Sequence, residues 1–145
     1  MKGSENVQIS RQCDYAIRTI FELARIYPKM SSSKKISSKY KIPKSFLNKI
    51  IQELVKIGLF ETVRGAHGGV RLCAPPDSIT LKDVIEHVDG PIVINECLMG
   101  IGLCFRQTDC PAHQVLLKAR KAFLRELNTK TIADLIKDEK DSMDN

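Results

Sequence analysis

Three cysteines stand close together in the second half of the chain, and their spacing is its clearest chemical signal. Cys97, Cys104 and Cys110 are separated by gaps of six and five residues. The stretch shows little periodicity, so a loop can bring the three thiols to one point. Thiolates are preferred ligands of iron–sulfur clusters and also of zinc. Small zinc modules more often pair cysteines two residues apart, a spacing absent here. The residues alone leave a cluster, a zinc ion and a thiol switch as open alternatives.

The composition narrows the class of protein that carries these thiols. The 145 residues are 43% hydrophobic and 28% charged, ordinary values for a globular protein. No run approaches the ~20 apolar residues of a membrane span, and no apolar signal segment follows Met1 and Lys2. We therefore expect a cytoplasmic protein with no membrane partner, whose cysteines serve metal or redox chemistry rather than disulfides. Cys13 and Cys73 are expected to be small buried hydrophobic residues.

Charge is distributed unevenly along the chain. Residues 1–76 carry 14 basic and 5 acidic side chains, a net +9, whereas residues 77–145 carry 9 basic and 12 acidic, a net −3. A basic first half is typical of a module that meets a polyanion. We therefore expect a DNA-binding module over 1–76 and a second functional part over 77–145. A merely solubilising surface is the alternative.

The elements that must position these residues follow from apolar periodicity, which predicts a mainly helical chain. Helices are expected over 10–26, 34–41, 43–57, 81–88 and 112–128, and short strands over 60–63 and 70–72. A loop of about 92–111 carries the cysteines, and Asp109 is expected to cap the helix that follows it. Residues 131–136 are expected to add one short turn, and the polar tail 138–145 to be disordered.

Three helices followed by a hairpin make a winged helix-turn-helix, whose third helix enters the DNA major groove. The outward positions of that helix carry short polar and cationic side chains: Lys44, Ser45, Asn48, Lys49, Gln52 and Lys56. At the hairpin tip, Arg64 is expected to reach a minor groove beside Gly65, Gly68 and Gly69, which allow close approach to a phosphate. His67 at the same tip is a candidate phosphate contact. The alternative is an amphipathic helix beside an ordinary turn.

The long helix over 112–128 carries an apolar stripe too extensive to lie bare on a small monomer. We expect it to form a two-fold dimer interface through Val115, Leu116, Ala119, Phe123 and Leu127. A two-fold dimer presents two recognition helices, so the expected partner is a pseudo-palindromic duplex of DNA.

Three sequence stretches closely resemble one family. They are Ile42-Pro43-Lys44-Ser45-Phe46-Leu47, Leu54-Val55-Lys56-Ile57-Gly58-Leu59, and Arg64-Gly65-Ala66-His67-Gly68-Gly69-Val70-Arg71-Leu72. The family is the Rrf-two family of bacterial winged-helix repressors, and the resemblance runs from about Ile9 to Ile136. It implies that Ser45, Asn48 and Lys49 read bases and that Arg64 reaches the minor groove. Lys44, Arg71 and Ser37 are implied phosphate contacts.

The resemblance also bears on the cysteines, because cluster-binding members of the family carry three in the same loop. It implies an iron–sulfur cluster on Cys97, Cys104 and Cys110. By the same resemblance, His113 is the fourth ligand of a two-iron cluster, and Asp14 from the partner subunit is the alternative for a four-iron cluster. The two-iron form with His113 is favoured slightly. The ordinary alternative for Asp14 is an ion pair with Arg18.

The function that these features indicate is a homodimeric transcription regulator, a repressor, whose DNA affinity depends on the cluster. An iron–sulfur electron carrier is one alternative, and a family regulator controlled by a protein partner or a metabolite is another. No phosphate-binding glycine motif and no nucleophile elbow appears, so we expect no enzyme.

Overall fold

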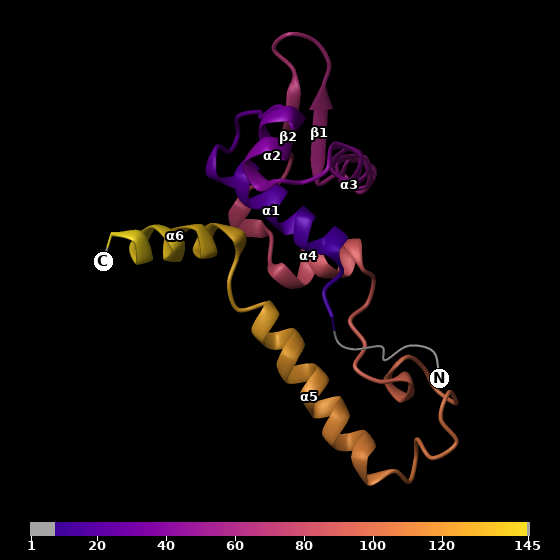
Figure 1. Ribbon diagram of the computed structural model, residues 1–145. Coiled ribbons are helices and arrows are strands. Elements are labelled where there is room, and N and C mark those ends of the chain that lie inside the picture. The colour runs from indigo at the N-terminus through magenta and orange to yellow at the C-terminus, as the bar shows by residue number, and fades with distance from the viewer. Residues whose placement is uncertain (1–7, 145) are drawn as a thin grey trace.

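The computed structural model describes residues 8–144, which form six α-helices, two short 3-10 helices and one two-stranded sheet. In chain order the elements are α1 (Arg11–Arg25), α2 (Ser33–Tyr40), α3 (Lys44–Lys56), β1 (Phe60–Val63), β2 (Gly69–Leu72), η1 (Pro76–Ser78), α4 (Leu81–Val88), η2 (Glu96–Leu98), α5 (Pro111–Leu127) and α6 (Ile132–Met143). Figure 1 shows a head made of α1 to α4 and the hairpin, with α5 extending away from it. The mainly helical fold class expected from the sequence is confirmed. Within the described residues, no helix is long and apolar enough to cross a membrane.

The head has one hydrophobic core, to which α1, α2, α3 and the hairpin all contribute. The Ser10 hydroxyl starts α1 by accepting a hydrogen bond from the Cys13 backbone N–H at 3.0 Å. Gly58 follows the end of α3 with φ +75°, a conformation that favours glycine. Buried residues recur every three or four positions, as a one-sided helix requires: Ala16, Ile20, Leu23, Ile36, Leu47, Ile50, Ile51 and Leu54.

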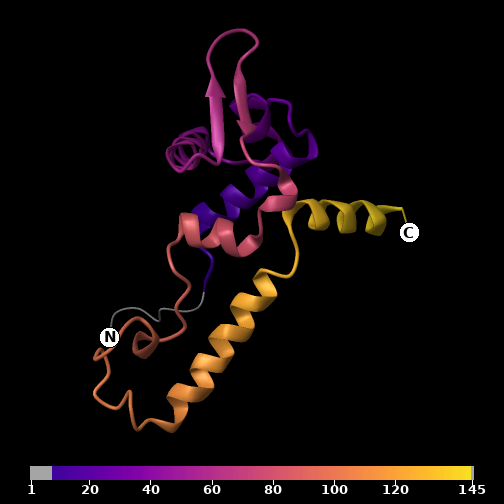
Figure 2. The same cartoon turned by 180° about the vertical axis from the view of Figure 1, so that it is seen from behind.

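The hairpin forms the wing of this winged helix-turn-helix. Its strands are antiparallel, with Phe60 opposite Leu72 and Val63 opposite Gly69. Strand β2 of the wing is joined to the segment just before α2, because Ser31 and Val70 exchange backbone hydrogen bonds of 2.9 Å. Phe60, Val70 and Leu72 point into the core, whereas the tip projects away from it (Figure 2).

Helix α6 completes the core of the head and is longer than the sequence indicates. Ile132 and Ile136 are buried in the same cluster as Ile20 and Leu54. Thr131 and Asp134 form a capping box that starts the helix. Helix α6 continues to Met143, so it is longer than the expected short turn, and the expected disorder is wrong for residues 138–143, while Asn145 lies outside the described residues. Packing against α1 and an ion pair between Arg25 and Glu139 at 2.5 Å give this polar segment its tertiary support.

Helix α5 has no buried residue in this chain. Val115 is 66% exposed and Phe123 37% exposed. The last turns contact the chain's own body, because Leu124 and Leu127 pack on a small cluster of Cys13, Ile85 and Ile92. The predicted cap is wrong: Cys110, not Asp109, occupies the N-cap position, and Pro111 begins the helix without a side-chain cap.

Candidate functional site

The first candidate site is the groove between α3 and the wing. One hollow is lined from α3 by Asn48 and Gln52, from the wing by Thr62 and Arg64, and by Ser33 at the start of α2. The outward residues predicted from the sequence are all exposed on α3: Lys44, Ser45, Asn48, Lys49, Gln52 and Lys56. The groove therefore presents amide and hydroxyl groups suited to base edges, bordered by cations suited to phosphates.

Glycines at the wing tip leave its backbone uncovered by side chains. A Cβ on Gly68 would lie 2.0 Å from the Val63 carbonyl oxygen, so only glycine fits there. Gly65 has φ +111°, and its carbonyl accepts a hydrogen bond from the Gly68 N–H at 3.1 Å. Arg64 and His67 are both exposed at this tip. The tip can thus approach a polyanion closely and offer a cationic side chain.

Two of the implied phosphate contacts are already engaged within the chain. Arg71 makes an ion pair with Glu61 across the wing at 2.6 Å. The Ser37 hydroxyl donates to the Ile42 carbonyl at 2.7 Å, which fixes the turn before α3. Lys44, Lys49 and Arg64, by contrast, are exposed, and Arg64 lines the groove itself.

The second candidate site is the cysteine loop, which lies at the far end of the molecule from the wing (Figure 1). Cys97, Cys104 and Cys110 line one pocket, together with His113 from the first turn of α5. Cys97 is buried, and the other two cysteines are half-buried. Within residues 8–144, no three His, Cys, Asp or Glu side chains lie close enough together to hold one metal ion. The sequence-predicted donors thus share a pocket without forming a closed ligand set.

His113 and Asp14 differ in their surroundings. The Nδ1 atom of His113 is buried and has no hydrogen-bond partner among the described residues. A buried ring nitrogen without a partner is unfavourable unless a ligand satisfies it. Asp14 instead makes the expected ion pair with Arg18 at 2.8 Å and does not line the cysteine pocket of its own chain.

Two residues that hold the loop could not be singled out from the sequence. The Arg120 guanidinium of α5 donates to the Ile92 carbonyl at 2.8 Å, at the start of the loop. The Gln107 side chain bonds three backbone groups inside the loop. Neither shows a signal in the sequence, since Arg120 looks like any surface cation of a helix and Gln107 lies where there is no periodicity.

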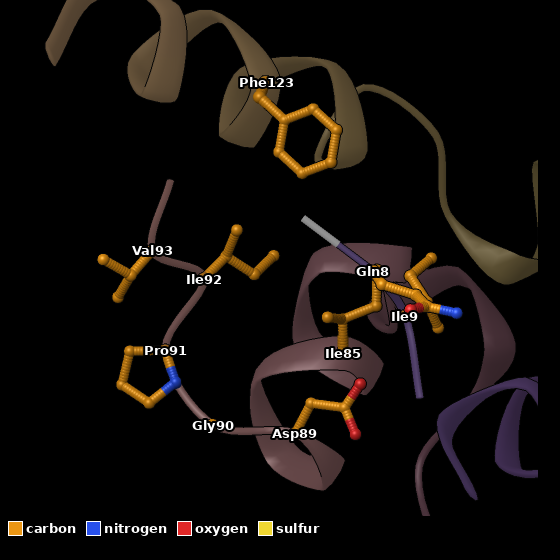
Figure 3. A pocket seen from close by; sticks show the side chains of 9 residues that line it. All are labelled: Gln8, Ile9, Ile85, Asp89, Gly90, Pro91, Ile92, Val93 and Phe123. Carbon is orange, nitrogen blue, oxygen red and sulfur yellow. The ribbon is translucent and has the colours of Figure 1, made fainter. Parts of the chain in front are cut away.

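The elements that carry the two candidate sites contact one another where α1, α4 and α5 meet (Figure 3). There Phe123 of α5 lies near Ile92, while Ile9 and Ile85 line another side of the same pocket. The Asp89 carboxylate accepts hydrogen bonds from the backbone N–H of Ser10, at 2.9 Å, and from its hydroxyl. These contacts fix the start of α1 to the end of α4.

Cys13 and Cys73 have different surroundings. Cys13 is fully buried beside this junction, as expected. Burial, reinforced by the negative charges of Asp89 and Asp14, raises the pKa of its thiol to about 12. Cys73 is exposed, so its expected burial is wrong. Because Leu72 points inward, the next residue of the extended chain points outward.

A winged helix-turn-helix head, an exposed polar face on α3 and a bare basic wing tip together define a DNA-binding transcription regulator. The chain belongs to the Rrf2 family, described as an iron-dependent transcriptional regulator, which matches residues 9–138. The regulator NsrR of Bacillus subtilis (strain 168) is 33% identical over 139 residues, covering 94% of this chain and 95% of that protein. Protein aau3 of Rhizobium meliloti (strain 1021) is 36% identical over 132 residues, covering 90% of this chain and 86% of that protein.

Solved structures agree with this family assignment. CymR (YrzC), described as the global cysteine regulator of B. subtilis, superposes with a TM-score of 0.76 at 27% identity, covering 90% of this chain and 96% of that one. IscR of T. potens superposes with a TM-score of 0.75 at 26% identity, covering 97% of this chain and 93% of that one. The relatives whose names state a function are regulators rather than enzymes, as the sequence indicated.

Proposed function

We propose that this chain is a homodimeric transcription repressor whose affinity for its operator depends on an iron–sulfur cluster bound by Cys97, Cys104 and Cys110. The observation that carries the proposal is the shared pocket of the three thiols and His113, with the buried Nδ1 of His113 lacking a partner among the described residues. Thiolate sulfur and imidazole nitrogen are donors that suit iron in such clusters. The donor set therefore fits the group.

His113 is the proposed fourth ligand, which favours a two-iron over a four-iron cluster. His113 lies three residues after Cys110, on the first turn of α5, so both face one side of the helix. Asp14 is the alternative and would have to come from the partner subunit, since in its own chain it lies outside the pocket. A bound cluster would supply a centre that responds to iron supply, redox state or nitric oxide.

The chain's own residues provide a route from the loop to the DNA groove. Cys110 is the N-cap of α5, and Arg120 ties the start of the loop to the same helix. The last turn of α5 packs on α1 and α4, which belong to the head that carries α3. A change in the conformation of the cysteine loop would therefore change the angle between α5 and the head. In a dimer joined through α5, that angle sets the spacing of the two recognition helices.

A different candidate function is regulation without a cluster. It is favoured by the likeness to CymR, described as a cysteine regulator, and by the lack of a closed ligand set among the described residues. The chain would then respond to a protein partner or a metabolite. An electron carrier is not favoured, because it leaves the DNA-binding head without a role.

The test is purification without oxygen, followed by iron and sulfide analysis and an operator titration at one salt concentration. We expect a coloured protein whose operator affinity changes by ~1–3 kcal/mol when the cluster is removed. Cys97→Ala, Cys104→Ala and Cys110→Ala should each abolish the cluster, whereas the exposed Cys73→Ala serves as the matched control. A colourless wild-type protein contradicts the cluster, and equal affinities on every operator contradict cluster-dependent control.

A further inference from the structure

The cysteine loop has an internal support that involves no cysteine. The side-chain amide of Gln107 donates from Nε2 to the Cys97 carbonyl at 3.0 Å and to the Gly100 carbonyl at 3.2 Å. Its Oε1 accepts a hydrogen bond from the Gly102 backbone N–H at 2.9 Å. Both donors and the acceptor of the amide are thus engaged, and every partner is backbone.

These hydrogen bonds join two parts of the loop that a cluster would also have to join. Gln107 lies between Cys104 and Cys110, while all its side-chain partners lie in the segment 97–102. The Gln107 backbone N–H donates to the Cys104 carbonyl at 3.1 Å, so its own position is fixed to the second cysteine. The side chain is half-buried and lines the same pocket as the three thiols.

Hydrophobic packing holds little of the segment that follows Cys97. Met99, Ile101, Leu103 and Phe105 are all exposed, from 60% for Leu103 to 101% for Ile101. Hydrophobic burial within this chain therefore contributes little over residues 99–105. Gly102 adopts a φ of +85°, and the only hydrogen bond described for its backbone N–H is the one to Gln107.

We infer that Gln107 is a positioning residue that organises the cysteine loop before a cluster arrives, by holding the Cys97 segment against the segment of Cys104 and Cys110. The role toward a cluster rests on the proposed function, whereas the hydrogen bonds of the Gln107 amide do not depend on it. Preorganisation reduces the ordering cost of ligand binding, so the wild-type loop binds a cluster more firmly than a loop without the amide.

The first experiment uses the full-length protein without a cluster and measures hydrogen exchange at the Gly102 amide, together with the alkylation rate of Cys97. Gln107→Ala removes all three side-chain bonds, so Gly102 exchange should rise by about tenfold and Cys97 should react several-fold faster. Gln107→Glu keeps an acceptor for Gly102 but loses both donors. It should accelerate Cys97 alkylation as much as Gln107→Ala, with a smaller effect on Gly102 exchange.

The matched control is Gln114→Ala, which removes an exposed glutamine from the first half of α5. It should leave both rates unchanged. The melting temperature should be the same in all variants, because the loop lies outside the core of the head. Unchanged Gly102 exchange and Cys97 alkylation in Gln107→Ala overturn the inference.

The second experiment reconstitutes the cluster and compares visible circular dichroism and the rate of iron release to a chelator. Gln107→Ala should alter the dichroism bands and release iron several-fold faster than wild type, with Gln114→Ala unchanged. Identical spectra and release rates in wild type and Gln107→Ala overturn the positioning role. If wild type accepts no cluster at all, the proposed function fails, and the exchange and alkylation rates still decide whether Gln107 organises the loop.

Discussion

At the scale of single residues, the surroundings of a side chain decide its chemistry more than its type does. The chain contains five cysteines. Three of them share a pocket, one is buried in the core and one is exposed. The same contrast separates His113, whose buried Nδ1 lacks a partner among the described residues, from Asp14, which is paired with Arg18. Substitutions of the histidine and chemical labelling of the buried thiol test these contrasts.

If the proposed cluster is present, His113→Ala should change its spectrum and shorten its lifetime more than Asp14→Ala does. The physical reason is that His113 lies in the thiol pocket, whereas Asp14 is held by Arg18 outside it. The measurement is visible absorbance and cluster decay in air for both variants. The opposite order would identify Asp14 of the partner subunit as the ligand and favour the four-iron form.

Cys13 should resist iodoacetamide at about pH 8 in the folded protein and react only after unfolding. Its thiol is fully buried, and its pKa is raised from the ordinary 9.0 to about 12. Below pH 9.0 the thiol is protonated in both the folded and the unfolded protein, so its titration does not lower the stability. As the pH rises from 9.0 toward about 12, the unfolded state loses this proton first, and the free energy of unfolding falls. Mass spectrometry of the labelled protein checks the reactivity, with exposed Cys73 as the internal reference. Labelling of Cys13 as fast as that of Cys73 contradicts its burial.

At the scale of elements, helices with strong apolar periodicity could be predicted to within about one residue. The expected 10–26 and 81–88 helices correspond to α1 and α4, because caps and one-sided burial leave clear marks in a sequence. Helix α6 could not be predicted in full. Its second half, from Lys137 to Met143, has no apolar stripe and depends on the packing of its first half against the head.

The same limit applies inside the cysteine loop. The three cysteines could be singled out from their residue type and spacing, and His113 was implied by the family resemblance. Gln107 could not, because a side chain that bonds only backbone leaves no pattern in the sequence. The cysteines of the pocket could therefore be predicted. The hydrogen bonds of Gln107 that hold the loop could not, because they depend on a loop conformation that leaves no periodic pattern.

Helix α3 and the wing should contact DNA together. Lys49→Ala and Arg64→Ala should each weaken operator binding, and the slope of log affinity against log salt should fall by about one for each phosphate that the protein no longer neutralises. Lys140→Ala is the control, because it removes the same charge from α6, on the other side of the head. Binding titrations at several salt concentrations provide the measurement. A salt slope equal to that of wild type in both groove variants contradicts this interface.

Helix α6 should be essential to the stability of the head. Ile132 is fully buried, so Ile132→Ala should lower the free energy of unfolding by roughly 2–5 kcal/mol. Met143→Ala changes a side chain that is 78% exposed in the same helix and should be close to neutral. Urea denaturation of the two variants compares them directly. Equal midpoints would show that α6 contributes nothing to the core.

At the scale of the whole molecule, the exposed apolar face of α5 needs a partner, and a second copy of the chain is the proposed one. Leu116→Asp combined with Phe123→Asp should produce monomers or aggregates, because two charges would be buried in the two-fold interface. Lys118→Asp alters the opposite face of the same helix and should leave the dimer intact. Light scattering distinguishes these results. A stable dimer of the double variant would place the interface elsewhere.

The two ends of the described chain meet in one core, and this has a consequence for how the protein is made. Ile20 near the beginning and Ile136 near the end lie in the same buried cluster, with the cysteine loop between them in sequence. A ribosome releases residues in order, so the head cannot be completed until the loop and α5 have already emerged. During synthesis, the three pocket thiols therefore leave the ribosome before the core of the DNA-binding head is complete.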